Sequence, residues 1–402
     1  MALALEGMTV LDVSQVAAVP MAARHLADFG ADVIHIEKTV TGDSFRGVGR
    51  ADISPELVHY NWENFNRNKR SMAIDLSQDE GQKIVYKLIE KADVFMTNMR
   101  LFEREKFHVE YETLTEINPK IIYGSLTGHG KNGPDRNAPA FDATAYWARS
   151  GIPHVLAEPG MPPPSQTIAF GDNVAALALA CGIITALLVR ERTGIGQEVD
   201  ISLLHTGIYQ ISSDISRALA TGQDCEDWKP RSKEDSPNAL SGLKQTMDDR
   251  WLFFVIGQTD RYWSKYCKAI EREDLKNDPR FDTFEHRVEN HIELYRILEK
   301  VFLSKTLEEW KARLEGIPVA AVQNLREVIA DPQVRANNIF VPFNHPIYGR
   351  MEVVTNLVKL NKTPATIRTS APEYGQHTEE ILLENGYTWD EITQFKERGI
   401  IS

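Results

Sequence analysis

The sequence has few cysteines and lacks the usual metal and hydrolase motifs. Its 402 residues include three cysteines, Cys181, Cys225 and Cys267, which lie far apart and form no CxxC pair. This excludes a disulfide framework, and a reducing cytoplasm is the expected compartment. There is no HExxH motif and no Cys/His cluster, so we expect no bound metal. No GxSxG elbow is present either, which argues against a serine hydrolase.

Targeting and membrane-spanning signals are also missing. The N-terminal stretch MALALEGMTVLD has no basic region, and its apolar run is too short for a signal peptide. The uncharged stretch 173–189 is just below the length that spans a bilayer, and it contains Asn173, Gly182 and Thr185. We interpret this stretch as a buried helix and expect no membrane partner.

Positive charge is in deficit. The chain has 45 Lys and Arg residues against 57 Asp and Glu residues, a formal net charge of -12. Such a surface repels nucleic acids and anionic membranes, so neither is an expected partner. A ligand that carries phosphates would need a local basic pocket.

Short β-branched segments alternate with helical patterns in the first two hundred residues. MTVLDVS, ADVIHIE, ADVFMTN, KIIYGSL and QEVDISL are typical of strands, whereas SQDEGQKIVYKLIEKA is typical of an amphipathic helix. Strands and helices in alternation predict an α/β fold with a large Rossmann-like parallel sheet covered by helices.

The composition changes in the second half of the chain. Residues 220–245 are polar and punctuated by Pro and Gly, and RWLFFVIG then reads as a new strand. We expect a large domain formed by both chain ends, residues 1–220 and 321–402, with a smaller α+β domain inserted at residues 221–320.

Two motifs have competing interpretations. Gly128 to Gly133 matches GxGxxG, but Pro134 and Pro139 follow and prevent the helix that a dinucleotide site requires, so we predict a loop. The cluster Arg67, Lys69 and Arg70 is either a solvated turn or an anion site.

One acid stands before the apolar stretch, in FGDNVAALALACG. Asp172 is either the cap of a helix, which would stabilise the fold by about 1 kcal/mol, or a carboxylate held for chemistry. The two interpretations are compatible, because helix N–H groups keep a carboxylate ionised and ready to attack an electrophile.

Several stretches, in order along nearly the whole chain, resemble the class III CoA-transferases of the formyl-CoA transferase and carnitine CoA-transferase (CaiB/BaiF) type. They are LEGMTVLDVSQVAAVP, DFGADVIHIEKTVTGD, NRNKRSMAIDL, NPKIIYGSLTGHGKNGP, RTGIGQEVDISLL, DPRFDTFEHRVEN, GIPVAAVQNLREVIADPQV and PEYGQHTEEIL. The resemblance implies transfer of CoA from an acyl-CoA to a free carboxylic acid. It implies no prosthetic group, because coenzyme A is itself part of the substrate.

The resemblance also implies roles for individual residues. Asp172 matches the family's nucleophile, which would form a mixed anhydride and then an aspartyl-CoA thioester. The positions that match CoA-binding residues are Val16, Ala17, Ala18, Lys38, Ile74, Asp75, Leu76, Asn98, Met99, Arg100, Lys106, Phe141 and Asp142. Among them, Lys38, Arg100 and Lys106 would form the basic pocket that the phosphates of CoA need.

Two alternatives remain open at this point. The related 2-methylacyl-CoA racemases carry a histidine where this chain has Phe141, which cannot transfer a proton; approach of His129 or His154 from elsewhere is the route left open. A non-catalytic CoA-binding subunit of a heteromeric transferase is the second alternative. Family members form interlocked homodimers, and the same assembly is expected here.

Overall fold

The computed structural model describes residues 3–47, 58–158, 160–230 and 232–402, which form two compact units. Unit 1 consists of residues 1–155, 164–216 and 338–402, and unit 2 of residues 156–163 and 217–337. The prediction that both chain ends share the large domain is therefore confirmed. Unit 2 extends to residue 337, beyond the expected return at 321, and it includes β9 (Val319–Ala321), which pairs with β8 (Trp251–Phe254).

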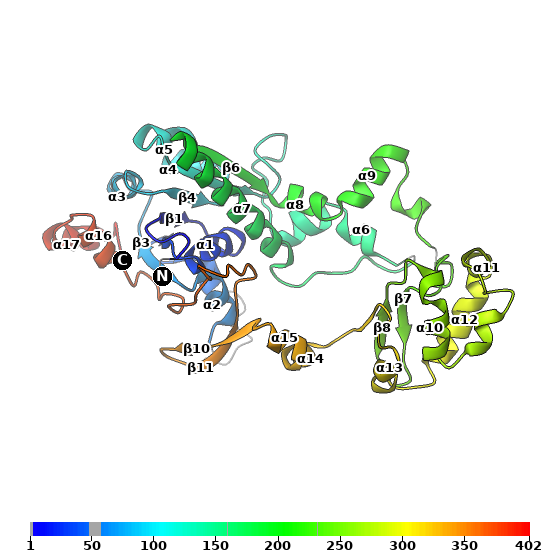
Figure 1. Ribbon diagram of the computed structural model, residues 1–402. Coiled ribbons are helices and arrows are strands. Elements are labelled where there is room, and N and C mark those ends of the chain that lie inside the picture. The colour runs from blue at the N-terminus through cyan, green and yellow to red at the C-terminus, as the bar shows by residue number, and fades with distance from the viewer. Residues whose placement is uncertain (1–2, 48–57, 159, 231) are drawn as a thin grey trace. The chain divides into compact units, whose positions relative to one another are not determined.

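A six-stranded parallel sheet forms the centre of unit 1, in the order β3-β2-β1-β4-β5-β6 (Figure 1). The order reverses between β1 and β4, where the chain crosses from one half of the sheet to the other. The five strands predicted in the first two hundred residues are confirmed, and β3 is the sixth strand of the sheet. Their bounds are β1 Thr9–Val13, β2 Asp32–Glu37, β3 Lys69–Ala73, β4 Val94–Thr97, β5 Ile122–Thr127 and β6 Gln197–Ser202.

Helices cover both faces of this sheet because successive strand residues point to opposite sides. Val10 and Val33 pack against α1 (Ala18–Asp28), α2 (Tyr60–Asn66) and α7 (Phe170–Thr193). Leu11 and Ile34 belong to the core of the other face. That face carries α3 (Asp79–Ile89), α5 (Tyr111–Ile117), α16 (Thr378–Glu384) and α17 (Trp389–Glu397).

The apolar stretch forms α7, which packs against α1, β5 and β6. By length and composition α7 would suffice to cross a bilayer, a test that core helices also meet. Gly124 on β5 and Gly182 on α7 allow the close approach, since a Cβ at Gly182 would lie 2.5 Å from Val199 Cγ1. The prediction of a buried helix holds for one face only, because Ile184 and Leu188 are exposed.

The C-terminal part of unit 1 returns to the sheet. Residues 340–354 form an antiparallel hairpin of β10 (Phe340–His345) and β11 (Gly349–Val354). The Asp75 N–H donates to the Ile400 carbonyl (2.8 Å), and Ile74 forms a bridge with Ile401. The remaining elements of unit 1 are η1 Ser44–Arg46, α4 Leu101–Phe107, the π-helical turn η2 Asp142–Ala148, α6 Ile152–Leu156, α8 Leu203–Gln210 and α9 Ser212–Thr221, of which α6 and α9 extend into unit 2.

Unit 2 is an α+β domain with its own core, as predicted. β7 (Gly242–Gln245), β8 and β9 form an antiparallel sheet. Its core includes Phe254, Tyr266, Phe302 and Trp310, which are fully buried. The surrounding helices are η3 Cys225–Asp227, α10 Thr259–Ala269, η4 Glu273–Asn277, α11 Phe284–Glu289, α12 His291–Phe302, α13 Leu307–Arg313, α14 Leu325–Ala330 and α15 Pro332–Ala336.

The basic cluster at the start of β3 is not a solvated turn. Lys69 is 2% exposed, and its Nζ lies 2.9 Å from Asp12 Oδ2. Arg67 is 3% exposed and lies 2.9 Å from Asp28 Oδ2. Both cations are held by carboxylates of the protein itself, because a buried charge requires a partner. Arg70 alone is partly exposed.

We predict that Lys69→Met lowers the free energy of unfolding by about 3 kcal/mol, because Asp12 loses one partner of a buried ion pair. Arg70→Met is the matched control on the same strand. Its partners Asp32, Glu380 and Glu384 are about half exposed, so its loss costs about 1 kcal/mol or less. Urea unfolding followed by fluorescence measures both, and equal losses would contradict the prediction.

Candidate active site

An open cleft lies at the carboxyl edge of the unit 1 sheet, where the strand order reverses. Parallel sheets bind ligands at this position. The cleft encloses about 1080 Å³, open solvent included. Its lining comes from segments that follow β1, β4, β5 and β6 and from the start of α7: Gln15, Val16, Ala17, Ala18, Asn98, Met99, Arg100, Glu103, Leu126, Thr127, Gly128, Ala138, Pro139, Ala140, Phe141, Asp142, Asp172 and Leu203.

A second, smaller cleft of about 420 Å³ adjoins the first through Gln15, Asn98, Met99 and Glu103. It extends toward the end of β2. Its other lining residues are Val13, Ser14, Ile36, Glu37, Lys38, Gly42, Asp43 and Phe107. Together the two clefts form an elongated surface that suits a long ligand.

Asp172 lies in the first turn of α7 but is not its cap. The N-cap is Ala169, with φ 58, so Asp172 is the third residue of the helix. The carboxylate that accepts from the helix start is Asp142, whose Oδ1 and Oδ2 lie 3.1 and 3.0 Å from the Gly171 N. The capping interpretation of Asp172 is therefore wrong. Asp142 accepts from the helix start instead, and Asp172 remains in the lining of the cleft.

The absence of a side chain at Gly171 makes this arrangement possible. A Cβ there would lie 2.2 Å from Tyr146 Cδ1 and 2.5 Å from Asp142 Oδ1, closer than atoms approach. Tyr146 belongs to the same π-helical turn η2 as Asp142 and is fully buried. The backbone at the start of α7 therefore packs directly against side chains of this turn. This contact fixes the position of Asp172.

The two carboxyl groups influence each other's protonation. Burial and the nearby charge of Asp142 raise the pKa of Asp172 to about 7. Burial also raises the pKa of Asp142, while hydrogen bonds from the Gln166 side chain and the Gly171 N–H oppose this change. Asp172 thus changes charge near neutral pH, as is typical of acids in active sites.

The turn between β1 and α1 forms the opposite part of the cleft lining. Gln15 and Asn98 exchange two hydrogen bonds, of 3.1 Å to Asn98 Oδ1 and 2.7 Å to the Gln15 carbonyl. Val16 adopts φ 72, and α1 begins directly afterwards, with Ala17 as its N-cap and no side-chain capping bond. Ala17 and Ala18 at this helix start line the cleft.

The three predicted cations occupy different places. Lys38 is exposed and lines the second cleft. Arg100 lines the first cleft, where its Nε lies 3.2 Å from Glu103 Oε2. Lys106 is exposed on α4 and lines neither cleft, and its Nζ lies 5.4 Å from the Phe107 ring centre.

The predicted segment Ile74, Asp75 and Leu76 also lies outside both clefts. Ile74 and Leu76 are buried in the core. The Asp75 carboxylate accepts from the Ser77 N–H (2.9 Å), the Ser77 hydroxyl (2.6 Å) and the Gln78 amide (2.9 Å). Its part in CoA binding stays a prediction.

The remaining predicted positions line the first cleft. Val16, Ala17, Ala18, Asn98, Met99, Arg100, Phe141, Asp142 and Asp172 are brought together there. Residues 128–133 form a loop, as predicted, and no helix begins between this loop and Asp142. Phe141, at the position of the racemase histidine, is 66% exposed. His129 lies 3.5 Å from Arg149 and does not line the cleft.

Several residues of the site were not predicted. Thr127 and Leu203 line the first cleft; Thr127 is the last residue of β5, and Leu203 directly follows β6. The rule that ligands bind at the carboxyl ends of parallel strands could have identified them. Asp43 lines the second cleft, and its hydrogen bond to the β1–α1 turn has no local signal in the sequence.

Comparisons with known proteins identify the family of the chain. Residues 5–378 match the model of CoA-transferase family III. The chain is similar to (R)-2-hydroxy-4-methylpentanoate CoA-transferase of Clostridioides difficile, with 34% identity over 99% of each chain. It is also similar to cinnamoyl-CoA:phenyllactate CoA-transferase of Clostridium sporogenes, with 31% identity over 97% of this chain and 95% of the relative.

The fold leads to the same family. A crystal structure of a CAIB/BAIF family protein from Brucella suis matches with a TM-score of 0.83 and 27% identity, over 96% of this chain and 100% of that chain. The chain belongs to CoA-transferase family III. It is a CoA-transferase, whose substrates are CoA thioesters and carboxylic acids.

We predict that Asp142→Asn lowers the pKa of Asp172 from about 7, because the repulsion between the two carboxylates is lost. The asparagine oxygen can still accept from Gly171, so the helix start is preserved. The carboxyl carbon shift of 13C-aspartate-labelled protein measures the titration, with Asp172→Asn for assignment. Asp135→Asn, a surface control beside Arg149, should leave this pKa unchanged.

Proposed function

We propose that Asp172 is the nucleophile that carries CoA from an acyl-CoA donor to a free carboxylic acid. The observation that supports this most directly is the division of roles at the start of α7. Asp142 accepts from the helix N–H group, and the Asp172 carboxylate lines the cleft with no capping role. A carboxylate in this position is available to attack a thioester.

In the first half of the proposed reaction, an oxygen of Asp172 attacks the thioester carbonyl carbon of the donor. The new C–O bond replaces the C–S bond, giving a mixed anhydride and CoA thiolate. The thiolate then attacks the Asp172 carbonyl carbon, which releases the donor acid as a carboxylate. Asp172 is left as a CoA thioester, so the energy of the original thioester is conserved.

The second half reverses these events with a different acid. The acceptor carboxylate attacks the Asp172 thioester, forming a second mixed anhydride and releasing the thiolate. The thiolate attacks the acceptor carbonyl carbon and gives the new acyl-CoA with a free Asp172 carboxylate. No proton is consumed, and water has to be excluded because it would hydrolyse each intermediate.

Each step develops negative charge on a carbonyl oxygen. The Gly171 N–H is not available to stabilise it, because it donates to Asp142. We propose instead the backbone N–H groups of Ala17 and Ala18, at the start of α1 and in the lining of the same cleft. Donors fixed by the fold stabilise such a charge without reorganisation.

We propose that the acceptor is a 2-hydroxy monocarboxylic acid with an apolar side chain. Two of the relatives described above are named for acids of this kind. The first cleft supports this, because its lining includes Leu126, Ala140 and Phe141 near Asp172. Its single cation, Arg100, is already paired with Glu103, so a second substrate carboxylate has no free partner among the described lining residues.

The nucleotide end of CoA is proposed to lie in the second cleft, toward Lys38, while Arg100 lines the first cleft. Lys106, Ile74, Asp75 and Leu76 remain proposed CoA contacts on the basis of the family resemblance. All three cysteines are free, which is consistent with the proposed cytoplasmic location.

We predict that Asp172→Ala lowers kcat at least about 10³-fold, because the nucleophile is lost. For the unaltered enzyme, kcat/KM should rise as pH increases through about 7, where Asp172 becomes ionised. The assay supplies several acyl-CoA donors with 2-hydroxy, dicarboxylic and simple fatty acids, and follows new thioesters by mass spectrometry.

Hydroxylamine added during turnover should modify Asp172 in peptide maps. Full activity of Asp172→Ala, or modification at another residue, would contradict the proposed mechanism. Exchange of an α-proton with solvent deuterium without transfer to a second acid would support the racemase alternative. If the chain alone has no transferase activity but becomes active when a second polypeptide is added, the result would indicate a heteromer.

We also propose that the chain forms a homodimer, interlocked as in its family. The exposed side of α7 supports this, because Ile184 and Leu188 are 43% and 49% exposed in the single chain. Tyr209 on α8 is 73% exposed. Apolar side chains repeated along one helix face are typical of surfaces that another chain covers.

Leu188→Glu should shift the protein from dimer toward monomer, because a charge would be buried in the proposed interface. Arg192→Glu is the control, since it changes the charge of an exposed residue on the same helix. Sedimentation velocity measures both. A monomer for the unaltered protein, or an unchanged dimer in Leu188→Glu, would contradict the proposed interface.

A further inference from the structure

The turn between β1 and α1 contains an unusual backbone conformation. Val16 has φ 72, in the left-handed region that β-branched residues rarely occupy. Such a conformation costs about 1 to 2 kcal/mol and persists only where its surroundings impose it. Val16 precedes Ala17 and Ala18, and all three line the cleft that contains Asp172.

One side chain imposes this conformation. The Asp43 carboxylate accepts from the Val16 N–H with both oxygens, at 3.0 and 3.1 Å. Asp43 Oδ1 also accepts from the Phe45 N–H at 2.8 Å. Asp43 is 3% exposed, so these bonds do not compete with solvent. The distance of 27 residues between Asp43 and Val16 explains why no local pattern reveals the contact.

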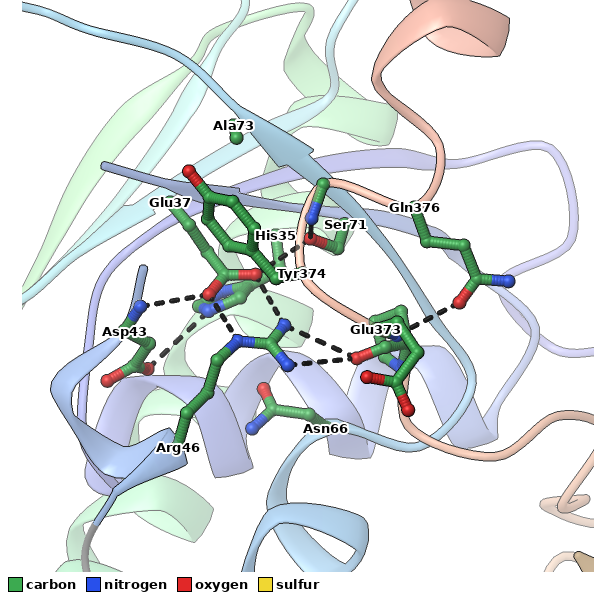
Figure 2. A network of polar contacts seen from close by, with 12 residues as sticks. His35, Glu37, Asp43, Arg46, Asn66, Ser71, Ala73, Glu373, Tyr374 and Gln376 are labelled. Atoms are coloured by element: carbon green, nitrogen blue, oxygen red, sulfur yellow. Dashed lines mark hydrogen bonds and ion pairs between the residues drawn. The ribbon is translucent and has the colours of Figure 1, made fainter. Parts of the chain in front are cut away.

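Asp43 is itself held in place by a network of buried groups (Figure 2). Its own N–H donates to Glu37 Oε2 at 2.9 Å, and Arg46 Nε donates to the same oxygen at 2.7 Å. Arg46 also donates to the Pro372 carbonyl at 3.3 Å. Glu37 is buried, and the loop after β2 therefore has little freedom to move.

A histidine connects Asp43 to the centre of the sheet. His35 Nε2 lies 3.5 Å from Asp43 Oδ2, and His35 Nδ1 lies 2.9 Å from Asp12 Oδ2. Burial alone would lower the pKa of His35, but the charge and hydrogen bond of Asp12 raise it to about 9. Lys69 also pairs with Asp12. His35 therefore links Asp43 to the buried Asp12 and Lys69 pair.

We propose that Asp43 is a positioning residue for acyl transfer. Its carboxylate holds the Val16 N–H, keeps the turn in the left-handed conformation, and so fixes the N–H groups of Ala17 and Ala18 that face the reacting carbonyl. This inference rests on the proposed function, because it assigns a purpose to the geometry of the β1–α1 turn. The stability of the fold alone does not require Val16 to be strained.

Glycine provides a specific test, because it adopts a positive φ without the penalty that valine pays. Asp43→Ala should lower kcat at least about tenfold, as expected for a small misplacement of catalytic donors. In the Val16→Gly background the same substitution should lower kcat less than about threefold, because the turn no longer depends on Asp43. The quantity compared is the fold-change in kcat caused by Asp43→Ala, measured separately in the unaltered protein and in Val16→Gly.

Asp43→Asn retains one acceptor oxygen and should show a smaller loss, and it replaces Asp43→Ala if that variant does not fold. Asp28→Asn is the control. It removes a buried carboxylate, paired with Arg24 and Arg67, that lines neither cleft. It should lower the unfolding temperature while kcat changes less than about twofold.

Equal losses from Asp43→Ala in both backgrounds would overturn the inference, as would an unchanged kcat in Asp43→Ala. A loss confined to KM would also overturn it, since Asp43 would then be a binding residue. The activity of Asp172→Ala distinguishes failure of the proposed function from failure of the inference about Asp43. If that variant is active, the proposed function fails. If it is inactive and the Asp43 effect is independent of Val16, only the present inference fails.

Discussion

The hydrogen bond from the Gly171 N–H to Asp142 is the interaction on which the site depends. A helix start leaves N–H groups without partners, and the nearest acid usually accepts from them. Here that acid is Asp142, on the turn η2, 29 residues before Gly171. Asp172 is therefore released from a structural role, while the missing side chain at Gly171 allows Asp142 to approach the helix start.

The sheet determines what Asp172 faces. Because the strand order reverses between β1 and β4, the segments that follow these strands separate and leave the first cleft between them. The start of α1 lies on one side, and the start of α7 contributes Asp172. Two helix starts thus contribute to one cleft, where their dipoles favour negative charge. In the proposed mechanism, a thioester carbonyl that enters here meets a nucleophile and backbone donors supplied by separate elements.

Sequence patterns predicted the strands and the inserted domain, because period-two alternation and apolar runs are local signals. They also singled out Asp172, but its role as a nucleophile came from the family resemblance. The family resemblance brought Asp142 and Val16 into the predicted site, but not their roles. The cap from Asp142 and the support of Val16 by Asp43 join residues 29 and 27 positions apart. The burial of Lys69 beside Asp12 spans 57 positions. Such contacts form only when the strands assemble, so no local pattern reveals them. The charges of Arg67, Lys69 and Arg70 by themselves suggested a solvated turn or an anion site.

The raised pKa of Asp172 has opposing effects on the proposed reaction. A more basic carboxylate is a better nucleophile, because reactivity increases with proton affinity. Only the ionised fraction reacts, however, and with a pKa of about 7 that fraction is roughly half at neutral pH. Further burial would make Asp172 more reactive when ionised but leave less of it ionised. Burial beside Asp142 holds the pKa near the working pH, where the product of the two factors is largest.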